Sequence, residues 1–188
     1  MKRKLWNVWV LLHWVMAFMV ILTFSIGVMS LNGLSGPAQK KLPLEIHLIL
    51  GISILVLAIA RYVIRIVIYK KPLLWHSQKK QPAVLLKNTF ILDALDKYVH
   101  PLLYIFTILM TLLGIAIAVP ADLLHAVFPG GTLQIPADFT VYPARAWHGA
   151  LSFVLVVLVF QHSLVALFHI LIKQDSFLKR MWFKGDRE

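Results

Sequence analysis

Residues 145–172 read RAWHGALSFVLVVLVFQHSLVALFHILI, and this apolar stretch decides how the chain can fold. At about 1.5 Å per residue, a helix of this length crosses the roughly 30 Å hydrocarbon core of a membrane. It carries two histidines, His148 and His162, fourteen residues apart. Fourteen steps of about 100° return to nearly the same face, so the two imidazoles are expected on one face, roughly 21 Å apart. The stretch predicts a transmembrane helix with one ligating group near each membrane surface.

Three further apolar segments are long enough to cross a membrane, at residues 5–31, 43–68 and 98–119. The chain has 188 residues, of which 60% are hydrophobic and only 14% charged, a composition outside the range of soluble domains. The first apolar segment exceeds the core of a secretory signal and no A-x-A-like cleavage site follows it, so we expect it to be retained. These features predict an all-α membrane protein of one domain, residues 1–188, built as a four-transmembrane-helix bundle.

The connections between these segments differ in character. The first is a plain loop rich in Gly, Ser and Pro. Within the second, residues 83–95 are apolar enough to form an interfacial helix that leads into the third span. The third holds several prolines and two adjacent glycines, and a short helical turn is expected at residues 122–128.

Lysine and arginine are distributed unevenly along the chain. The N-terminal tail, the second connection and the C-terminal tail carry three, eight and five of them, against only three on the opposite side, which are Lys40, Lys41 and Arg145. The positive-inside rule therefore predicts that both termini are cytoplasmic. Much of the net charge of +11 is then a signal of topology. Because the basic residues flank apolar helices and form no continuous basic face, we expect no nucleic-acid partner.

The chain contains no cysteine, which excludes disulfides, thiolate zinc sites, iron–sulfur clusters and haem attached covalently through C-x-x-C-H. Four neutral imidazoles within membrane spans cost free energy of burial unless they bind a ligand or a cofactor. Depth indicates which of them face each other. His13 and His162 lie roughly 12 Å and 16 Å from the inner ends of their helices, whereas His47 and His148 lie within roughly 6 Å of the outer ends. The predicted pairs are His13 with His162 and His47 with His148, each holding one noncovalent haem b through its iron.

Neighbouring residues are consistent with two haem sites. Gly51 is one turn after His47 and leaves room for a flat macrocycle. Arg61 is fourteen residues after His47, and its guanidinium suits a propionate of the inner haem. Arg65, one turn further, either does the same or extends to lipid phosphates.

Other readings of the histidines remain open at this point. His100 starts the third span and His169 follows His162 by seven residues, so either could replace an assigned inner ligand. His125, on the outer connection, could line an entrance to the outer haem. A haem-free ion transporter would also use histidines, although such a path usually recruits carboxylates, and Glu45 is the only acidic residue within the spans.

Several stretches are similar to the bacterial cytochrome b561 family. They are LLHW at residues 11–14, IHLILGISILVLAIARYVIR at 46–65, WHGALSFVLVVLVFQHSLVALFH at 147–169 and DSFLKRMW at 175–182. The resemblance covers essentially the whole chain and is weaker in the third connection. It implies a four-helix membrane bundle with two b haems, whose axial ligands carry over to His13, His47, His148 and His162. It also implies a multi-pass protein of the bacterial inner membrane.

Some members of that family oxidise superoxide on the periplasmic side and reduce ubiquinone, so the resemblance implies one-electron transfer between an outer donor and the quinone pool. The chain is then a superoxide:ubiquinone oxidoreductase or an electron carrier for a periplasmic redox protein. For an anionic donor, Lys40, Lys41 and Arg145 would supply positive potential at the outer mouth. A haem-bearing anchor subunit that relays electrons for a partner dehydrogenase is the alternative within the same chemistry.

Overall fold

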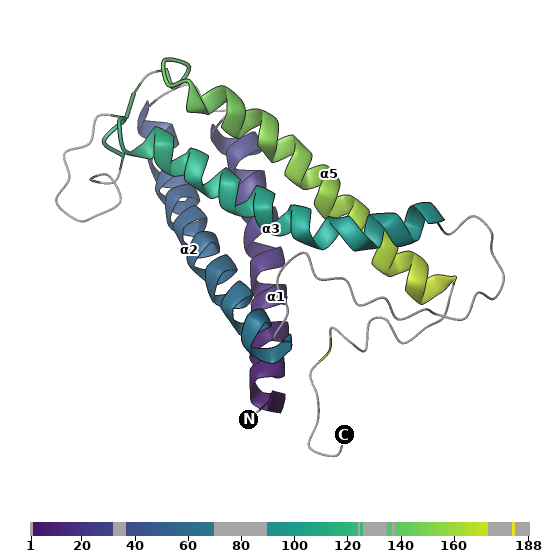
Figure 1. Cartoon of the computed structure of the whole chain (residues 1–188). Helices are drawn as coiled ribbons and strands as arrows, with labels where there is room; N and C mark the ends of the chain where they lie inside the picture. The colour runs from purple at the N-terminus through teal and green to yellow at the C-terminus, as the bar shows by residue number, and fades with distance from the viewer. Residues whose placement is uncertain are drawn as a thin grey trace.

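The computed structural model describes residues 2–31, 37–69, 90–123, 125, 135–136, 138–172 and 182. Its regular elements are helices that follow one another along the chain. In order, they are α1 (Lys2–Ser25), the π-helix η1 (Ile26–Leu31) that continues it, α2 (Pro37–Tyr69), α3 (Phe90–Ala118) and α5 (Ala144–Leu171). Figure 1 shows these helices gathered into one bundle.

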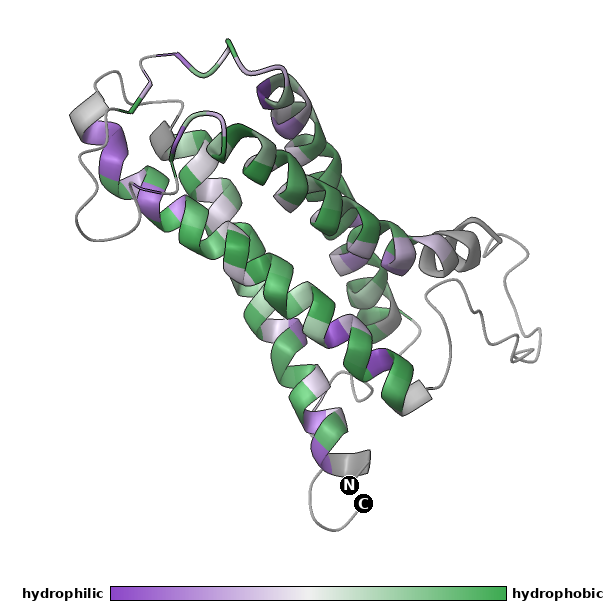
Figure 2. Ribbon diagram, turned by 60° about the vertical axis from the view of Figure 1, so that its left-hand side comes forward, coloured by the Kyte–Doolittle hydropathy of each residue, from purple (hydrophilic) through white to green (hydrophobic). Residues whose placement is uncertain are grey.

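Within the described part of the chain, four helices are long and apolar enough to cross a membrane. The qualifying stretches are Lys4–Met29, Gln39–Val67, Tyr98–Ala118 and Ala144–Phe168. Figure 2 shows hydrophobic residues along all four helices and hydrophilic residues concentrated toward their ends. The all-helical class and the four expected spans are therefore confirmed.

The outer surface of the bundle is apolar, as a lipid environment requires. The side chains of Phe18, Val56 and Phe153 are 68%, 59% and 62% exposed, whereas Val10 and Ala58 are fully buried. A small residue such as Ala58 lets neighbouring helices approach closely.

The helices pack mainly as two pairs, α1 with α2 and α3 with α5, and α2 joins the pairs by packing against α3. Figure 1 shows α5 extending along α3. Helix α5 has no comparable packing against α1 or α2. The space between these helices is therefore available for side chains and a cofactor.

Two helices begin earlier than the sequence predicts. Helix α2 starts six residues before position 43 and α3 eight residues before position 98, so Pro43 and Pro101 lie inside helices. The spans were predicted from apolarity, and each of these two helices continues beyond the start of its apolar segment. The predicted interfacial helix is represented by its last residues, 90–95, which form the first turns of α3. Residues 83–89, and most of the turn expected at 122–128, lie outside the described residues.

The end of the bundle opposite the start of α1 is closed by the chain that leaves α3 (Figure 1). Asp122 adopts a left-handed conformation with φ 53°, and the amide of Leu123 donates to the carbonyl of Ala118 at 2.9 Å. This reversal turns Leu123 inward, where it is buried with Leu44, Ala118 and Ile135. Asparagine and aspartate tolerate this conformation better than most residues. The cluster forms an apolar cap over the helix ends.

Two described residues far apart in the sequence meet near the start of α1. The indole Nε1 of Trp6 donates to the carbonyl of Trp182 at 3.3 Å. The cytoplasmic location of this end of the bundle remains a prediction from the charge distribution.

Candidate functional site

The first pair of histidines lies in the half of the bundle nearest the apolar cap. His47 in α2 and His148 in α5 face each other with ring centroids 6.1 Å apart and ring planes at 64°. The Nδ1 atom of His47 lies 3.1 Å from the carbonyl oxygen of Thr23 in α1. Because a carbonyl only accepts hydrogen bonds, Nδ1 carries the proton and Nε2 keeps its lone pair. That is the tautomer a metal ligand needs.

A cavity of about 390 Å³ surrounds this pair. All four helices and the cap contribute to its wall, and most of the lining is apolar. Gly51 and the two imidazoles line its interior, while Leu123 and Phe139 line it from the cap. A mostly apolar cavity with a few convergent polar groups is the usual form of a cofactor site.

Two of the three outer basic residues also line this cavity, Lys40 and Arg145. The guanidinium of Arg145 lies along the backbone of Gly149, where an added Cβ would meet its Nη1 at 2.9 Å. Arg145 is close enough to interact electrostatically with both His47 and His148. The third, Lys41, lies instead 4.0 Å from the carboxylate of Glu45, one turn along α2.

The second pair lies further from the cap. His13 in α1 and His162 in α5 have ring centroids 6.0 Å apart and ring planes at 81°. The ring of His100, in α3, lies 4.9 Å from that of His162. The sequence placed His100 at the start of a span. Because α3 begins at Phe90, His100 lies ten residues inside the helix, and three imidazoles meet at this level.

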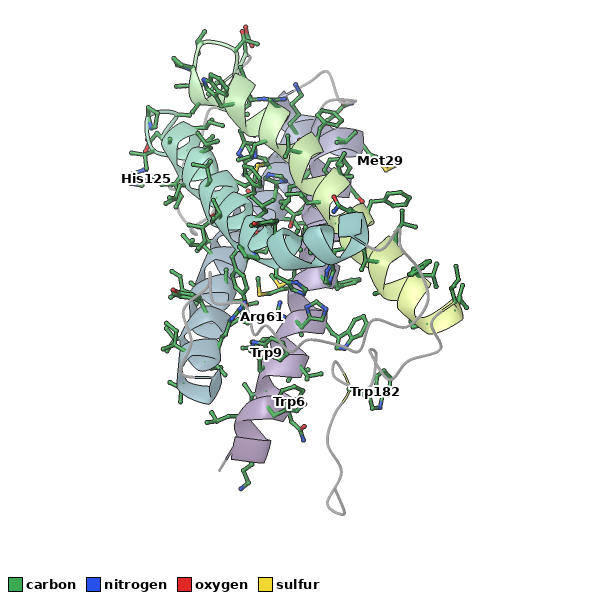
Figure 3. The ribbon with its side chains drawn as sticks, turned by 45° about the vertical axis from the view of Figure 1, so that its right-hand side comes forward. Trp6, Trp9, Met29, Arg61, His125 and Trp182 are labelled. Atoms are coloured by element: carbon green, nitrogen blue, oxygen red, sulfur yellow. The ribbon has the colours of Figure 1, made fainter. Side chains whose placement is uncertain are left out.

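A buried cation lies beside this second histidine pair. The Cζ atom of Arg61 is 4.7 Å from the ring centroid of Trp9 and 5.7 Å from that of Tyr104, and its Nε is buried. Figure 3 shows Arg61 and Trp9 adjacent between α2 and α1. Arg61 also interacts electrostatically with His13, whereas Arg65 does so with Tyr104. Guanidinium over aromatic faces is a favourable contact that holds Arg61 inside the bundle.

The remaining histidines are peripheral or not described. His125 projects outward near the cap in Figure 3, is exposed, and is hydrogen-bonded to the carboxylate of Asp122. The side chain of His169 and the whole of His76 lie outside the described residues. Among the residues described, no group of three or more His and acidic side chains has the geometry of a bare metal-ion site.

The two histidine pairs fit an iron between their rings. A metal–imidazole bond is about 2 Å long and a ring nitrogen lies about 1.1 Å from its ring centre, so trans imidazoles on one iron have centroids about 6 Å apart. The observed separations are 6.1 Å and 6.0 Å. Both separations thus match the distance that two imidazoles on one iron require. At the His47–His148 pair, the surrounding cavity adds space for a planar metal macrocycle.

Four apolar helices that bring histidine pairs together at two levels have the architecture of a membrane-embedded b-type cytochrome. The family model for prokaryotic cytochrome b561 matches residues 6–184, and the chain belongs to this family. Membership implies haem b binding and haem-based electron transfer across the membrane, and together with the four apolar helices it indicates a multi-pass bacterial membrane protein. No individually curated protein matches the chain.

Proposed function

We propose that this protein binds two b haems and moves single electrons between a donor on the outer side of the bacterial inner membrane and the quinone pool. The observation that carries the proposal is the separation of facing imidazoles, 6.1 Å in one layer and 6.0 Å in the other. Bound haem supplies the one-electron couple of its iron, which the chain's own residues lack.

In the outer layer, His47 and His148 would hold the haem through their imidazoles. The hydrogen bond from His47 Nδ1 to the Thr23 carbonyl directs its Nε2 toward the metal position. Gly51 leaves the cavity wall open, because an added Cβ there would have no protein atom within 4 Å. Arg145 and Lys40 provide the positive charge that haem carboxylates or an anionic donor requires.

In the inner layer, His13 and His162 have the same roles. Arg61 is held by Trp9 and Tyr104 near His13, where its planar fork can pair with a propionate. His100 contacts the ring of His162 from the side and supports it. The inner pair is assigned to His13 and His162 because their 6.0 Å separation leaves space for a metal, whereas the 4.9 Å separation of His100 and His162 does not.

A haem held by two histidines would supply one-electron chemistry without a bond between its iron and the donor or acceptor, so both would exchange electrons at the edge of the site. Superoxide and ubiquinone form a balanced pair of substrates: two superoxide ions lose one electron each and become dioxygen, and one quinone gains two electrons and two protons and becomes quinol. The positive residues at the outer cavity favour an anion such as superoxide as the donor.

A reduced-minus-oxidised optical spectrum of the purified protein tests this proposal. We expect a sharp α band from low-spin b haem in the unaltered chain. The His125→Ala variant serves as a control, because His125 is exposed and lies outside the cavity lining, and its band should be unchanged. A purified, folded protein with no α band would contradict the proposal.

A further inference from the structure

The imidazole rings of His47 and His148, the proposed outer-haem ligands, each lie against a glycine of a neighbouring helix. A Cβ atom at Gly27 would lie 3.2 Å from Cε1 and 3.6 Å from Nδ1 of His47. A Cβ atom at Gly114 would lie 3.3 Å and 3.7 Å from the same atoms of His148. Carbon atoms in unstrained contact are about 3.5–4.0 Å apart, so any side chain at either glycine would displace the ring.

Gly27 is accompanied by a backbone carbonyl four residues earlier. Thr23 precedes Gly27, and its carbonyl accepts the hydrogen bond from His47 Nδ1 at 3.1 Å. In a helix, residues four apart share a face, so Gly27 and the Thr23 carbonyl meet the same imidazole. The Nδ1 atom of His148 is buried beside Gly114 and makes no hydrogen bond with the described residues.

These glycine contacts follow the packing of the bundle. His47 belongs to α2 and contacts Gly27 in η1, which continues α1. His148 belongs to α5 and contacts Gly114 in α3, and α1 with α2 and α3 with α5 are the two main helix pairs. Gly27 lies where the backbone hydrogen bonding changes from α to π, since η1 begins at Ile26. Such π segments inside helices are frequent at functional sites.

We propose that Gly27 and Gly114 are positioning elements that fix the ring planes of the two outer-haem ligands, and that the Thr23 carbonyl fixes the Nδ1 proton of His47. Each ring lies against a glycine of the neighbouring helix, and this contact sets how closely the ring approaches that helix. The hydrogen bond from His47 Nδ1 to the Thr23 carbonyl leaves Nε2 of His47 as the ligating nitrogen. The hydrogen bond makes the imidazole more basic and thereby stabilises the ferric state.

This role differs from that of Gly51, whose added Cβ would meet no protein atom within 4 Å. Gly51 gives room to the macrocycle, whereas Gly27 and Gly114 give room to the ligands. The inference rests on the proposed function, since it concerns the ligands of the outer haem.

The test uses electron paramagnetic resonance and redox titration of the oxidised full-length protein with both haems bound. The variants are Gly27→Ala and Gly114→Ala. Their matched controls are Met29→Ala and Leu112→Ala, on the same helices but with side chains 77% and 50% exposed at the surface. Figure 3 shows Met29 pointing away from the bundle. The His47→Ala variant identifies the outer-haem signal by its loss.

In each glycine variant we expect the outer low-spin signal to shift in g value while the inner signal is unchanged. In Gly27→Ala the ferrous-to-ferric ratio of the outer haem at a fixed ambient potential should also rise severalfold, because a weakened hydrogen bond from His47 Nδ1 to the Thr23 carbonyl makes the ligand less basic. Both controls should match the parent. Unchanged signals in both glycine variants, equal shifts of both haems, or loss of both haems would overturn the inference. A parent protein without two low-spin signals would instead refute the proposed function.

Discussion

The haem content of single and double histidine variants tests whether the four imidazoles form two separate haem sites. On α5, His148 and His162 are fourteen residues apart, which places the two layers roughly 21 Å apart along the helix. At that separation the sites share no ligand, so losing one layer should leave the other intact. His47→Ala and His148→Ala should each lower the haem content from about two per chain to about one, and so should His13→Ala and His162→Ala.

The double variants give the sharper result. His47→Ala combined with His148→Ala removes both ligands of one haem, so it should lose no more haem than either single variant. His47→Ala combined with His162→Ala affects both layers and should reduce the haem content to about zero. The assay is the pyridine haemochrome content per chain, with folding followed by circular dichroism. A same-layer double variant that is folded and lacks both haems would refute the pairing.

His100 provides an independent check of the inner layer. Its ring is 4.9 Å from that of His162, so it is the one other described imidazole in contact with the assigned inner pair. We expect His100→Ala to retain two haems and His13→Ala to lose the inner one, as judged by haem content. Loss of the inner haem in His100→Ala together with its retention in His13→Ala would reassign the ligand.

Three further predictions follow from the residues around the histidines. Gly51→Leu should displace the outer haem and leave the inner one, because the added side chain occupies cavity space and meets no protein atom first; a haem content still at two would contradict this. Arg61→Leu should lower the midpoint potential of the inner haem by on the order of tens of millivolts. The reason is that a unit charge about 10 Å away, at an effective dielectric of about 20, contributes about 1.7 kcal/mol. A potentiometric titration without a shift would argue against a position of Arg61 near the haem. Arg145→Gln should slow superoxide oxidation and reduce the dependence of the rate on ionic strength, because Arg145 lines the cavity. Lys41→Gln should have a smaller effect because Lys41 lies beside Glu45. Stopped-flow rates at several salt concentrations that show equal effects for the two variants would contradict a role for the cavity position of Arg145.

The fold was largely predictable because membrane spans are specified by length and apolarity alone. The matched depths of the histidines followed from helical rise, and the structure brings His13 to His162 and His47 to His148. Helix starts were less predictable. The apolar segments begin at residues 43 and 98, whereas α2 and α3 begin at Pro37 and Phe90.

The predicted start of the third span at residue 98 explains why His100 was expected at a helix end and not beside His162. A histidine at a helix end is expected at the interface, whereas one that is ten residues inside a helix meets the inner layer. The contacts of Gly27 and Gly114 could not be predicted from local pattern either. Their importance depends on which imidazole of another helix lies above them, and that is decided by the packing of α1 with α2 and of α3 with α5.

The number of haem b groups held by the purified wild-type chain is the most direct measurement of all. Quantified pyridine haemochrome, combined with a count of low-spin ferric signals, should give two six-coordinate haems per polypeptide. One haem per chain, or any high-spin species with an open axial position, would contradict the double-layer arrangement.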